Sequence, residues 1–342
     1  MQDMTGHERR ALGTVAVTGG AGFIGSHLVQ ALLAEGNRVR IIDNFDSYYQ
    51  GKEANLLAVR DHPALTLDRT DILDTQALSR SFEAVDVVFH LAAQPGVRFS
   101  FENREKTRSV NVDGTRSVLE AASAAGARRL VFASSSSVYG LLETLPVSER
   151  QVPKPISPYG QSKIEGEHLL NDFYASGRIE TVALRLFSVF GPRQRPDMAG
   201  TRFLQRLTSS AAPLVTGDGM QTRDFTYVED VARAFVAAAR SERAAGDALN
   251  IGTGRESTLK RFLSLIVDFL GLKDSAVEHT RSGEGEPGRM RCDARRAEHA
   301  LDWRATVGLP EGLRKQVDWW VNEFMPDEER RLFQQRMTKS HV

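Results

Sequence analysis

The sequence is poor in several features that would each point to a particular class of protein. Its 342 residues include one cysteine, Cys292, so no internal disulfide can form. We expect the Cys292 thiol to be an unreactive packing group and the protein to be in the reducing cytoplasm. Lysine plus arginine and aspartate plus glutamate both number 44, so no net charge draws the chain to nucleic acid or membranes. No hydrophobic run can span a bilayer, and residues 1–12 are polar, without the apolar segment of a signal peptide. These absences predict a soluble globular protein without nucleic-acid or membrane partners, with a frayed N-terminus and no metal site.

From residue 14 onwards, short apolar runs alternate with longer helical stretches. We expect strands at 15–17, 39–42, 65–67, 87–91, 130–133 and 181–184, and helices at 22–34, 107–125 and 158–176. This alternation predicts an α/β protein with a Rossmann doubly wound parallel sheet, whose strands are buried between helices on both faces. Ligands of such sheets bind at the carboxyl ends of the strands.

After residue 188 the rhythm changes. A turn-rich loop at 191–196 precedes a strand expected at 214–215 and helices expected near 203–209, 228–239, 258–270 and 309–323. The run 250–254 is expected to return to the first sheet. The pattern therefore predicts a smaller, interleaved α/β domain, with 13–187 and segments near 224–254 in one unit and 188–223 and 255–330 in the other.

A glycine-rich turn joins the first strand to the first helix. Gly19, Gly22 and Gly25 permit a tight turn and close approach of a pyrophosphate to the helix N-terminus. Asp43, at the end of the second strand, can accept the adenosine ribose hydroxyls and repel a 2′-phosphate. These features favour NAD over NADP, the alternative being a plain strand-to-helix turn.

A second acidic residue follows the third strand. Asp71 can bind the adenine amino group, or it can cap a helix, because residues 70–74 also resemble a helix start. Both interpretations stay open.

Tyr159 and Lys163 lie one helical turn apart, so both side chains can face one cleft. We expect the lysine ammonium, helped by the positive charge of a nicotinamide, to lower the pKa of the phenol from about 10 toward neutrality, so that it can act as a base. A serine run at 134–137, after a strand, can supply a hydroxyl that bridges the tyrosine and a substrate oxygen. The alternative is an exposed pair on a helix.

Together these motifs resemble the extended short-chain dehydrogenase/reductase family of nucleotide-sugar epimerases and dehydratases. The resemblance covers nearly the whole chain after residue 12, in motifs at 18–25, 43–44, 71–72, 90–93, 111, 134–140, 159–163 and 185–192. It implies a Rossmann fold and a tightly bound NAD that is regenerated each turnover. It assigns to the cofactor site Gly19, Gly22, Phe23, Ile24, Gly25, Asp43, Asn44, Asp71, Ile72, Leu91, Ala92, Ala93, Asn111, Tyr159, Lys163 and Phe187.

Within that family, Ser135 falls at the catalytic serine or threonine position, beside Tyr159 and Lys163. The related 4,6-dehydratases carry Asp-Glu at the next two positions, and the related decarboxylases place a Glu there, whereas this sequence has Ser136 and Ser137. Without a carboxylic acid, elimination lacks its proton carrier, so epimerisation is predicted.

The runs 43–49, 91–100 and 191–198 resemble UDP-glucuronic acid 4-epimerases more than the UDP-galactose type, in which an Asn commonly replaces Ser188. A sugar carboxylate needs several donors, which small hydroxyls and an arginine can provide. The candidate arginines are Arg195 and Arg98, and each of these two can equally serve a diphosphate or the surface. The residues assigned to the substrate are Pro95, Gly96, Arg98, Ser135, Ser136, Ser137, Ser188, Arg195, Met198, Arg202, Arg223 and Arg289.

The sequence thus predicts an isomerase that interconverts UDP-glucuronic acid and UDP-galacturonic acid through a transient 4-keto sugar. The alternatives are a UDP-glucose or UDP-N-acetylglucosamine 4-epimerase, an NAD-dependent ketoreductase, and a nicotinamide-binding regulator without catalysis. Helices 107–125 and 158–176 are the pair through which the family usually forms a homodimer.

Overall fold

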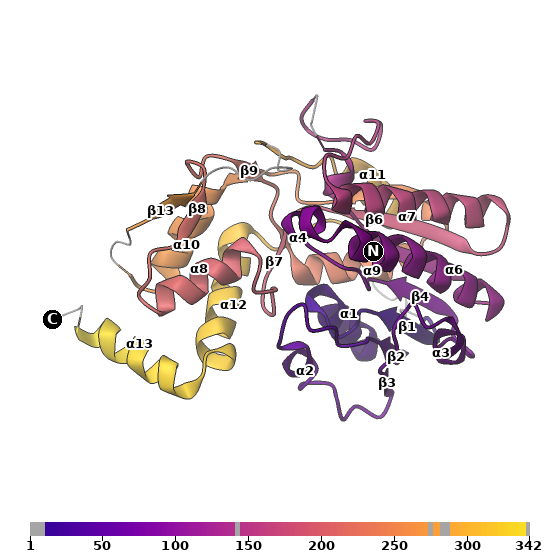
Figure 1. Cartoon of the computed structure of the whole chain (residues 1–342), viewed down its shortest axis with the longest axis horizontal. Helices are drawn as coiled ribbons and strands as arrows, with labels where there is room; N and C mark the ends of the chain where they lie inside the picture. Colours follow the sequence, from indigo (N-terminus) through magenta and orange to yellow (C-terminus); the bar gives the residue numbers. More distant parts are fainter. Residues whose placement is uncertain (1–10, 141–143, 273–275, 281–287, 340–342) are drawn as a thin grey trace, which may run out of the picture.

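The computed structural model describes residues 11–140, 144–272, 276–280 and 288–339. Within these residues the centre of the molecule is a seven-stranded parallel sheet, in the order β11-β6-β5-β4-β1-β2-β3 (Figure 1). Its strands are β1 (Thr14–Thr18), β2 (Arg38–Ile42), β3 (Leu65–Asp68), β4 (Val87–His90), β5 (Arg129–Ser135), β6 (Glu180–Leu186) and β11 (Ala248–Ile251). The predicted Rossmann sheet is confirmed, and the run expected to return to it pairs as β11 with β6.

Helices cover both faces of the sheet because successive strand residues point to opposite sides. Val15 and Val17 pack with α1 (Phe23–Ala34) and α9 (Val228–Arg240). Ala16 packs on the other face with α3 (Thr75–Ser81), α6 (Gly114–Ala124) and α7 (Pro158–Ala175). Two hydrophobic cores therefore flank one sheet, and Figure 1 shows the helices that lie beside it.

The expectation of a buried strand at 65–67 is wrong in part. The strand forms as β3, but Thr66 is exposed and Leu67 is 41% exposed. The reason is topological, because β3 is an edge strand with β2 as its neighbour on one side.

The single helix expected over 107–125 has three parts. They are α5 (Arg104–Arg108), a π-helical turn η1 (Ser109–Asp113) and α6. Asn111 lies in the π turn, where its side chain accepts from the Gln94 N–H at 2.7 Å and donates to the Ser162 hydroxyl at 2.9 Å. The buried Asn111 amide thus makes tertiary hydrogen bonds at the place where the helix widens into a π turn. The periodicity of the sequence does not reveal this widening.

The remaining elements form the smaller part of the molecule and the loops around the sheet. Those expected from the sequence are α8 (Ala199–Thr208), β8 (Leu214–Thr216), α10 (Leu259–Phe269) and α12 (Leu309–Trp319) with its π-helical extension η4 (Trp320–Phe324). A further C-terminal helix, α13 (Asp327–Lys339), was not expected. The short elements are α2 (Lys52–Asn55), α4 (Val97–Glu102), η2 (Ser136–Val138), β7 (Val189–Phe190), β9 (Thr222–Arg223), β10 (Thr226–Tyr227), η3 (Glu242–Ala244), β12 (Ser257–Thr258), β13 (Glu278–Thr280) and α11 (Arg295–Leu301).

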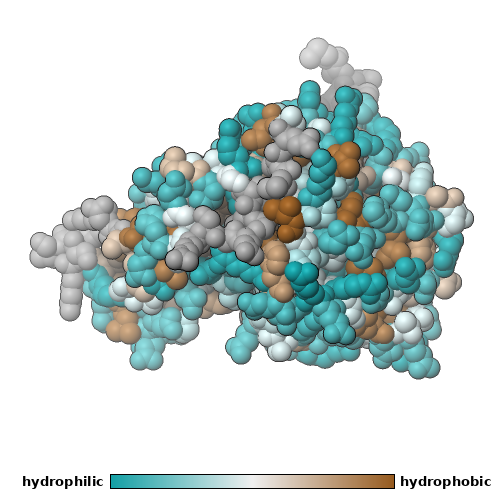
Figure 2. Space-filling model, turned by 45° about the horizontal axis from the view of Figure 1, so that its top comes forward, coloured by the Kyte–Doolittle hydropathy of each residue, from teal (hydrophilic) through white to brown (hydrophobic). Residues whose placement is uncertain are grey.

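The surface is mainly hydrophilic on the face drawn in Figure 2, with hydrophobic side chains in separate small groups. In the part of the chain that the structure describes, no helix combines the length and apolarity needed to cross a bilayer. Cys292 is buried and unpaired, as expected. The N-terminal stretch expected to be frayed lies outside the described residues up to residue 10.

Candidate active site

A cavity of about 900 Å³ runs along the carboxyl ends of the parallel strands. It is lined by residues that follow β1, β2, β3, β4, β5 and β6, and it continues into the smaller part between α8, β8 and α10. Sheets of this kind bind ligands at this edge, so the cavity is the candidate active site.

The glycine turn forms one wall of the cavity. Gly19 has a φ of +70°, and a side chain there would place its Cβ 2.7 Å from the backbone nitrogen of Ala92. Gly25 lies in the first turn of α1, where a Cβ would be 2.8 Å from the Cα of Gly20. The backbone is thus packed against itself, with the N-terminus of α1 open to the cavity, an arrangement suited to a pyrophosphate.

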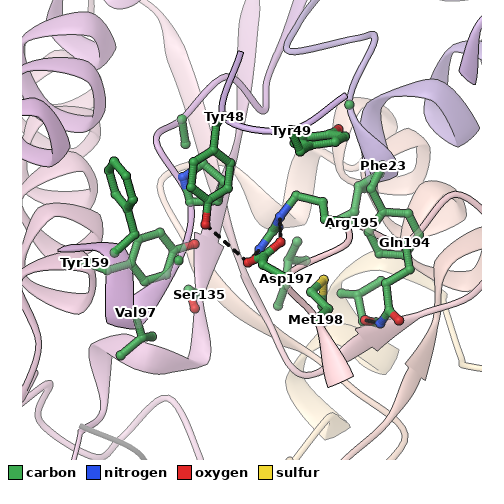
Figure 3. A pocket seen from close by; sticks show the side chains of 18 of the residues that line it. Phe23, Tyr48, Tyr49, Val97, Ser135, Tyr159, Gln194, Arg195, Asp197 and Met198 are labelled. Atoms are coloured by element: carbon green, nitrogen blue, oxygen red, sulfur yellow. Dashed lines mark hydrogen bonds and ion pairs between the residues drawn. The ribbon is translucent and has the colours of Figure 1, made fainter. Parts of the chain in front are cut away.

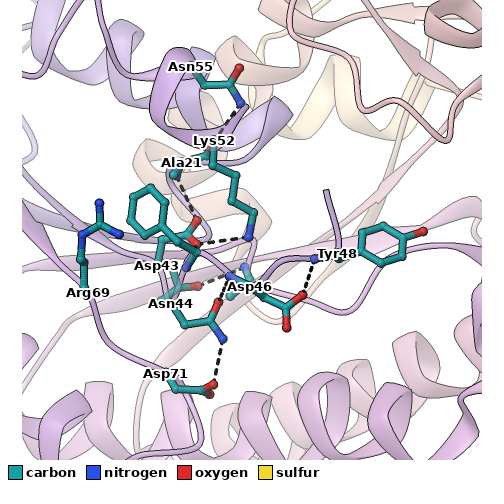
Figure 4. Close-up of polar contacts among 12 residues, drawn as sticks. Ala21, Asp43, Asn44, Asp46, Tyr48, Lys52, Asn55, Arg69 and Asp71 are labelled. Atoms are coloured by element: carbon teal, nitrogen blue, oxygen red, sulfur yellow. Dashed lines mark hydrogen bonds and ion pairs between the residues drawn. The ribbon is translucent and has the colours of Figure 1, made fainter. Parts of the chain in front are cut away.

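Asp43 lies at the end of β2, 5% exposed (Figure 4). Its carboxylate accepts from the backbone N–H groups of Ala21 at 3.2 Å and Phe45 at 2.8 Å, and the Lys52 ammonium is 3.4 Å away. A carboxylate has about four acceptor positions, so it can still receive a ribose hydroxyl. Asp43 therefore fits the ribose role predicted for it.

Asp71 does not cap the following helix. Asp74 is the cap, because its side chain accepts from the Ala77 N–H at 3.0 Å at the start of α3. Asp71 instead accepts from the Asn44 side-chain amide at 2.8 Å and borders the cavity (Figure 4). The capping interpretation of Asp71 is therefore wrong, and the adenine interpretation stays a prediction.

Tyr49 provides a direct test of whether a dinucleotide fits. Its hydroxyl is buried beside Gly22 and interacts with the Phe23 backbone N–H, but within the described part of the chain no acceptor receives its own proton. A buried hydroxyl proton without an acceptor is costly, and a phosphate oxygen at the glycine turn would supply one. The residues present therefore fit a dinucleotide.

The predicted catalytic residues meet at the centre of the cavity. The Ser157 hydroxyl caps α7 by accepting from the Gly160 N–H at 3.1 Å, and Tyr159 and Lys163 follow on successive turns. Ser135, at the end of β5, lies next to the Tyr159 phenol, and its hydroxyl favours the ionised form of that phenol, which acts to lower its pKa. Figure 3 shows the two side chains facing each other beside Tyr48.

The expectation that Lys163 lowers the pKa of Tyr159 is wrong for this structure. Burial raises the pKa of Tyr159, and the groups that act against burial are Arg195 and Ser135. The Lys163 nitrogen is 5.9 Å from the centre of the Tyr159 ring. Because Lys163 is only 2% exposed, burial lowers its own pKa to about 7, so this lysine loses its proton near neutral pH.

Three serines predicted to bind the substrate line the same cavity as Ser135 and Tyr159. Ser136 and Ser137 lie in η2, directly after Ser135, and Ser188 follows β6. All three line the cavity, as predicted.

Arg195 enters the cavity already paired. Its guanidinium donates to both oxygens of Asp197 at 2.9 and 3.0 Å, and the Tyr48 hydroxyl donates to Asp197 at 3.3 Å (Figure 3). The cation therefore faces Tyr159 and Tyr49 while its charge is largely compensated by Asp197. A ligand carboxylate would have to compete with Asp197 for this arginine.

The far end of the cavity contains further residues that were predicted to bind the substrate. Met198, Arg202 and Arg223 line it beside an aromatic pair, Phe225 and Phe262, whose ring centres are 4.5 Å apart. At the border with the sugar side, Pro95 and Gly96 also line the cavity, with Arg98, which donates to the Thr216 hydroxyl at 3.3 Å.

Two predicted residues do not border the cavity. Asn111 is buried in the π turn, where its amide holds Gln94 and Ser162, so it supports the site from behind. Arg289 is exposed and pairs with Glu256, which also accepts from the Thr222 hydroxyl at 2.7 Å. Every other predicted residue lines the cavity.

Sequence reasoning gave no role to several cavity residues. Tyr48, Tyr49 and Asp197 lie inside runs used for the family resemblance, and Lys52 follows the first run, nine residues after Asp43. The contact between Tyr48 and Asp197 is a hydrogen bond between residues 149 positions apart in the sequence. Spacing along the chain carries no signal for such contacts.

The order of these features along the chain matches a known family. The profile of the NAD dependent epimerase/dehydratase family matches residues 15–252, from β1 through the Tyr159 helix to the end of β11. The chain belongs to this family. The resemblance predicted from the motifs is confirmed, and NAD is the cofactor of this family.

Members of the NAD dependent epimerase/dehydratase family with assigned substrates are similar over most of the chain. The UDP-glucose 4-epimerase of Mycolicibacterium smegmatis is 36% identical over 313 residues, which cover 90% of this chain and 98% of that one. The structure of the UDP-glucuronic acid 4-epimerase from Bacillus cereus with UDP-glucuronic acid and NAD has a TM-score of 0.85 at 37% identity, covering 90% and 98%. That of the UDP-N-acetylglucosamine 4-epimerase from Methanobrevibacter ruminantium with UDP-N-acetylmuramic acid has a TM-score of 0.84 at 32% identity, covering 91% and 98%.

Proposed function

We propose that this chain catalyses the NAD-dependent 4-epimerisation of UDP-glucuronic acid to UDP-galacturonic acid. The observation that carries the proposal is that Ser136, Ser137 and Ser188 line the same cavity as Tyr159 and Ser135, with no carboxylic acid at the two positions after Ser135. Residues 13–187 with 224–254 would hold the cofactor, and 188–223 with 255–330 the nucleotide sugar.

The hydroxyl groups suit a sugar acid for an electrostatic reason. Ser136, Ser137 and Ser188 can each donate to a C6 carboxylate, and the short side chains leave room for it. A carboxylic acid at position 136 or 137 would repel the ionised sugar acid. Because Arg195 is paired with Asp197, neutral donors are the better candidates for this contact.

Tyr159 would take the proton of the sugar 4-hydroxyl, directly or through Ser135, as the carbon–hydrogen bond at C4 breaks. NAD, which the glycine turn and Asp43 would hold, would supply reversible hydride acceptance at C4, and inversion would require the 4-keto sugar to turn its other face to the cofactor before the hydride returns. The same phenol then gives the proton back, so atoms and electrons balance over one turnover.

The 4-keto form of a uronic acid is a β-keto acid, which loses CO₂ readily. Decarboxylation needs the bond to the carboxylate aligned with the ketone π system. Donors that fix the carboxylate out of that alignment would suppress the loss. Ser136, Ser137 and Ser188 would thus protect the intermediate as well as bind the substrate.

The test is proton NMR of UDP-glucuronic acid incubated with purified protein, without added NAD. UDP-galacturonic acid should appear, and the alanine variants of Ser136, Ser137 and Ser188 should slow the reaction and release a keto-pentose nucleotide. Ser117→Ala is a matched control, because this hydroxyl donates to the Asp113 carbonyl outside the cavity. Unchanged rate and unchanged by-product in all three variants would remove the role assigned to these serines.

A second candidate is a UDP-glucose or UDP-N-acetylglucosamine 4-epimerase, because relatives with those names cover as much of the chain at similar identity. Parallel incubations with the two neutral sugars discriminate. Faster conversion of either than of UDP-glucuronic acid would replace the proposed substrate while leaving the reaction class intact.

A further inference from the structure

A buried ion pair lies directly behind the catalytic residues. Glu167 and Arg185 are 4% and 6% exposed, and the guanidinium donates to Glu167 Oε2 at 2.6 Å and to Oε1 at 3.0 Å. The Ser134 hydroxyl donates to the same carboxylate at 2.5 Å. Neither charged residue borders the cavity, so neither can contact a ligand there.

The pair joins the elements that carry the catalytic groups. Glu167 is on α7 with Tyr159, and Ser134 is on β5, next to Ser135. Arg185, on β6, also donates to the Tyr139 hydroxyl at 2.9 Å, which donates to Asn250 on β11 at 2.6 Å. One polar network therefore connects α7 to three adjacent strands at the level of the catalytic serine.

Glu167 also follows Lys163 by one helical turn. Lys163 is almost completely buried, with its nitrogen 4.7 Å from the centre of the Phe132 ring, so its ammonium has lost most of its hydration. Within the described residues, burial lowers the pKa of Lys163 and the Glu167 carboxylate acts to raise it, so Glu167 favours the charged form of this lysine.

The other charged groups around α7 do not replace Glu167. His90, on β4, is held by Thr18 and Thr115, and burial lowers the pKa of its imidazole to about 3, so it is neutral. The Arg129–Glu180 pair lies at the opposite end of β5 and β6. On α4, α5, η1 and α6, the charged residues are exposed or half-exposed, namely Arg98, Glu102, Arg104, Glu105, Lys106, Arg108, Asp113, Arg116 and Glu120.

We propose that Glu167 is a positioning residue that favours the protonated form of Lys163, and that Arg185 and Ser134 hold its carboxylate where it can do so. The proposal rests on the proposed function only in placing Lys163 in the catalytic site. A buried pair serving stability alone can be replaced by apolar side chains at little cost, whereas this one also sets the protonation of a neighbour.

The first test measures the protonation of Lys163 directly. NMR of ¹³C-labelled lysine resolves the eight lysines of the chain, and Lys163→Arg identifies the signal. Glu167→Gln should lower the titration midpoint of Lys163 by about one pH unit or more, as expected for a charge one helical turn away in a medium of effective dielectric about 20. Glu165→Gln is the matched control, because Glu165 is on the same helix, half-exposed, and accepts from Gln161 at 2.9 Å.

Glu167→Gln leaves Arg185 as an unpaired buried cation, which can prevent folding. The double variant Glu167→Gln, Arg185→Met removes both charges and should fold, and its Lys163 midpoint should also be lower. If the midpoint in the folded double variant equals that of the parent protein, Glu167 serves only packing and the proposal fails.

The second test uses turnover. With UDP-glucuronic acid, the double variant should lose activity at a lower pH than the parent, because Lys163 loses its proton earlier. Its kcat should fall more than tenfold, while KM changes less than twofold. Because the NMR titration needs no turnover, absence of epimerisation in the parent protein would refute the proposed function alone, and an unchanged midpoint would refute the positioning role alone.

Discussion

Gly25→Ala sets helix propensity against packing at the dinucleotide turn. Gly25 is in the first turn of α1, where alanine would favour the helix by about 1 kcal/mol over glycine. The added Cβ, however, would lie 2.8 Å from the Cα of Gly20 and closer still to the carbonyl oxygen of Gly19. Carbon atoms in contact are about 3.5–4.0 Å apart, so the turn would have to move by about 0.7 Å or more.

Overpacking of this kind costs about 1–3 kcal/mol, and a clash with backbone falls at the upper end because no side chain can rotate away. The clash therefore outweighs the gain in propensity by about 1–2 kcal/mol. If the glycine turn changes its conformation while the protein stays folded, the same free energy is lost from NAD binding. Each 1.4 kcal/mol then weakens the affinity for NAD about tenfold.

The assay is the NAD content of the purified, gel-filtered protein, measured on the nucleotide released by denaturation, together with the urea midpoint. Gly36→Ala is the control, since Gly36 ends the same helix at a φ of +77° with no atom within 4 Å of an added Cβ. It should cost about 1 kcal/mol of stability and leave NAD content unchanged. A Gly25→Ala protein with full NAD and higher stability would refute the argument.

The remaining predictions concern catalysis, stability and assembly. Tyr159→Phe should lower kcat by about 10²–10⁴-fold with NAD retained, and a variant that keeps more than a tenth of the rate would argue against the phenol as base. Lys163→Met should abolish turnover yet raise the urea midpoint at pH 7. The reason is that burial lowers the pKa of Lys163 to about 7, from 10.5 in the unfolded chain, so burying the charged lysine costs folding free energy. This cost is fully present below pH 7 and disappears as the pH rises toward 10.5. Arg289→Ala should change KM for UDP-glucuronic acid less than twofold, since this side chain pairs with Glu256 outside the cavity; a tenfold rise would return it to the nucleotide site. Sedimentation should show a homodimer at micromolar concentration through α6 and α7, and a pure monomer would exclude it.

Much of the fold could be predicted because its signals are local. The apolar runs that became β1, β2, β4, β5 and β6 were found within two residues of their ends, as were α1 and α7. The errors arose where partners distant in sequence decide. Leu67 is exposed because β3 has a single neighbour, and the helix at 107–125 widens at Asn111, whose amide bonds residues of other elements.

The candidate site shows the same division. The glycine turn, Asp43, the serine run and the tyrosine–lysine spacing are short patterns, and the chain order of the strands brings them to one edge of the sheet. The pairing of Arg195 with Asp197 and Tyr48, and of Glu167 with Arg185, could not be predicted, because each joins separate elements or depends on burial.

By itself, the sequence determined the family, the Rossmann sheet, and which side chains can meet at its carboxyl edge. The tertiary structure alone decided how strongly those groups hold their protons and which charges are already compensated. The pKa of Tyr159 is raised and that of Lys163 lowered because both are taken out of water, and burial is a property of the packed chain as a whole. The spacing of two residues on a helix contains no measure of it.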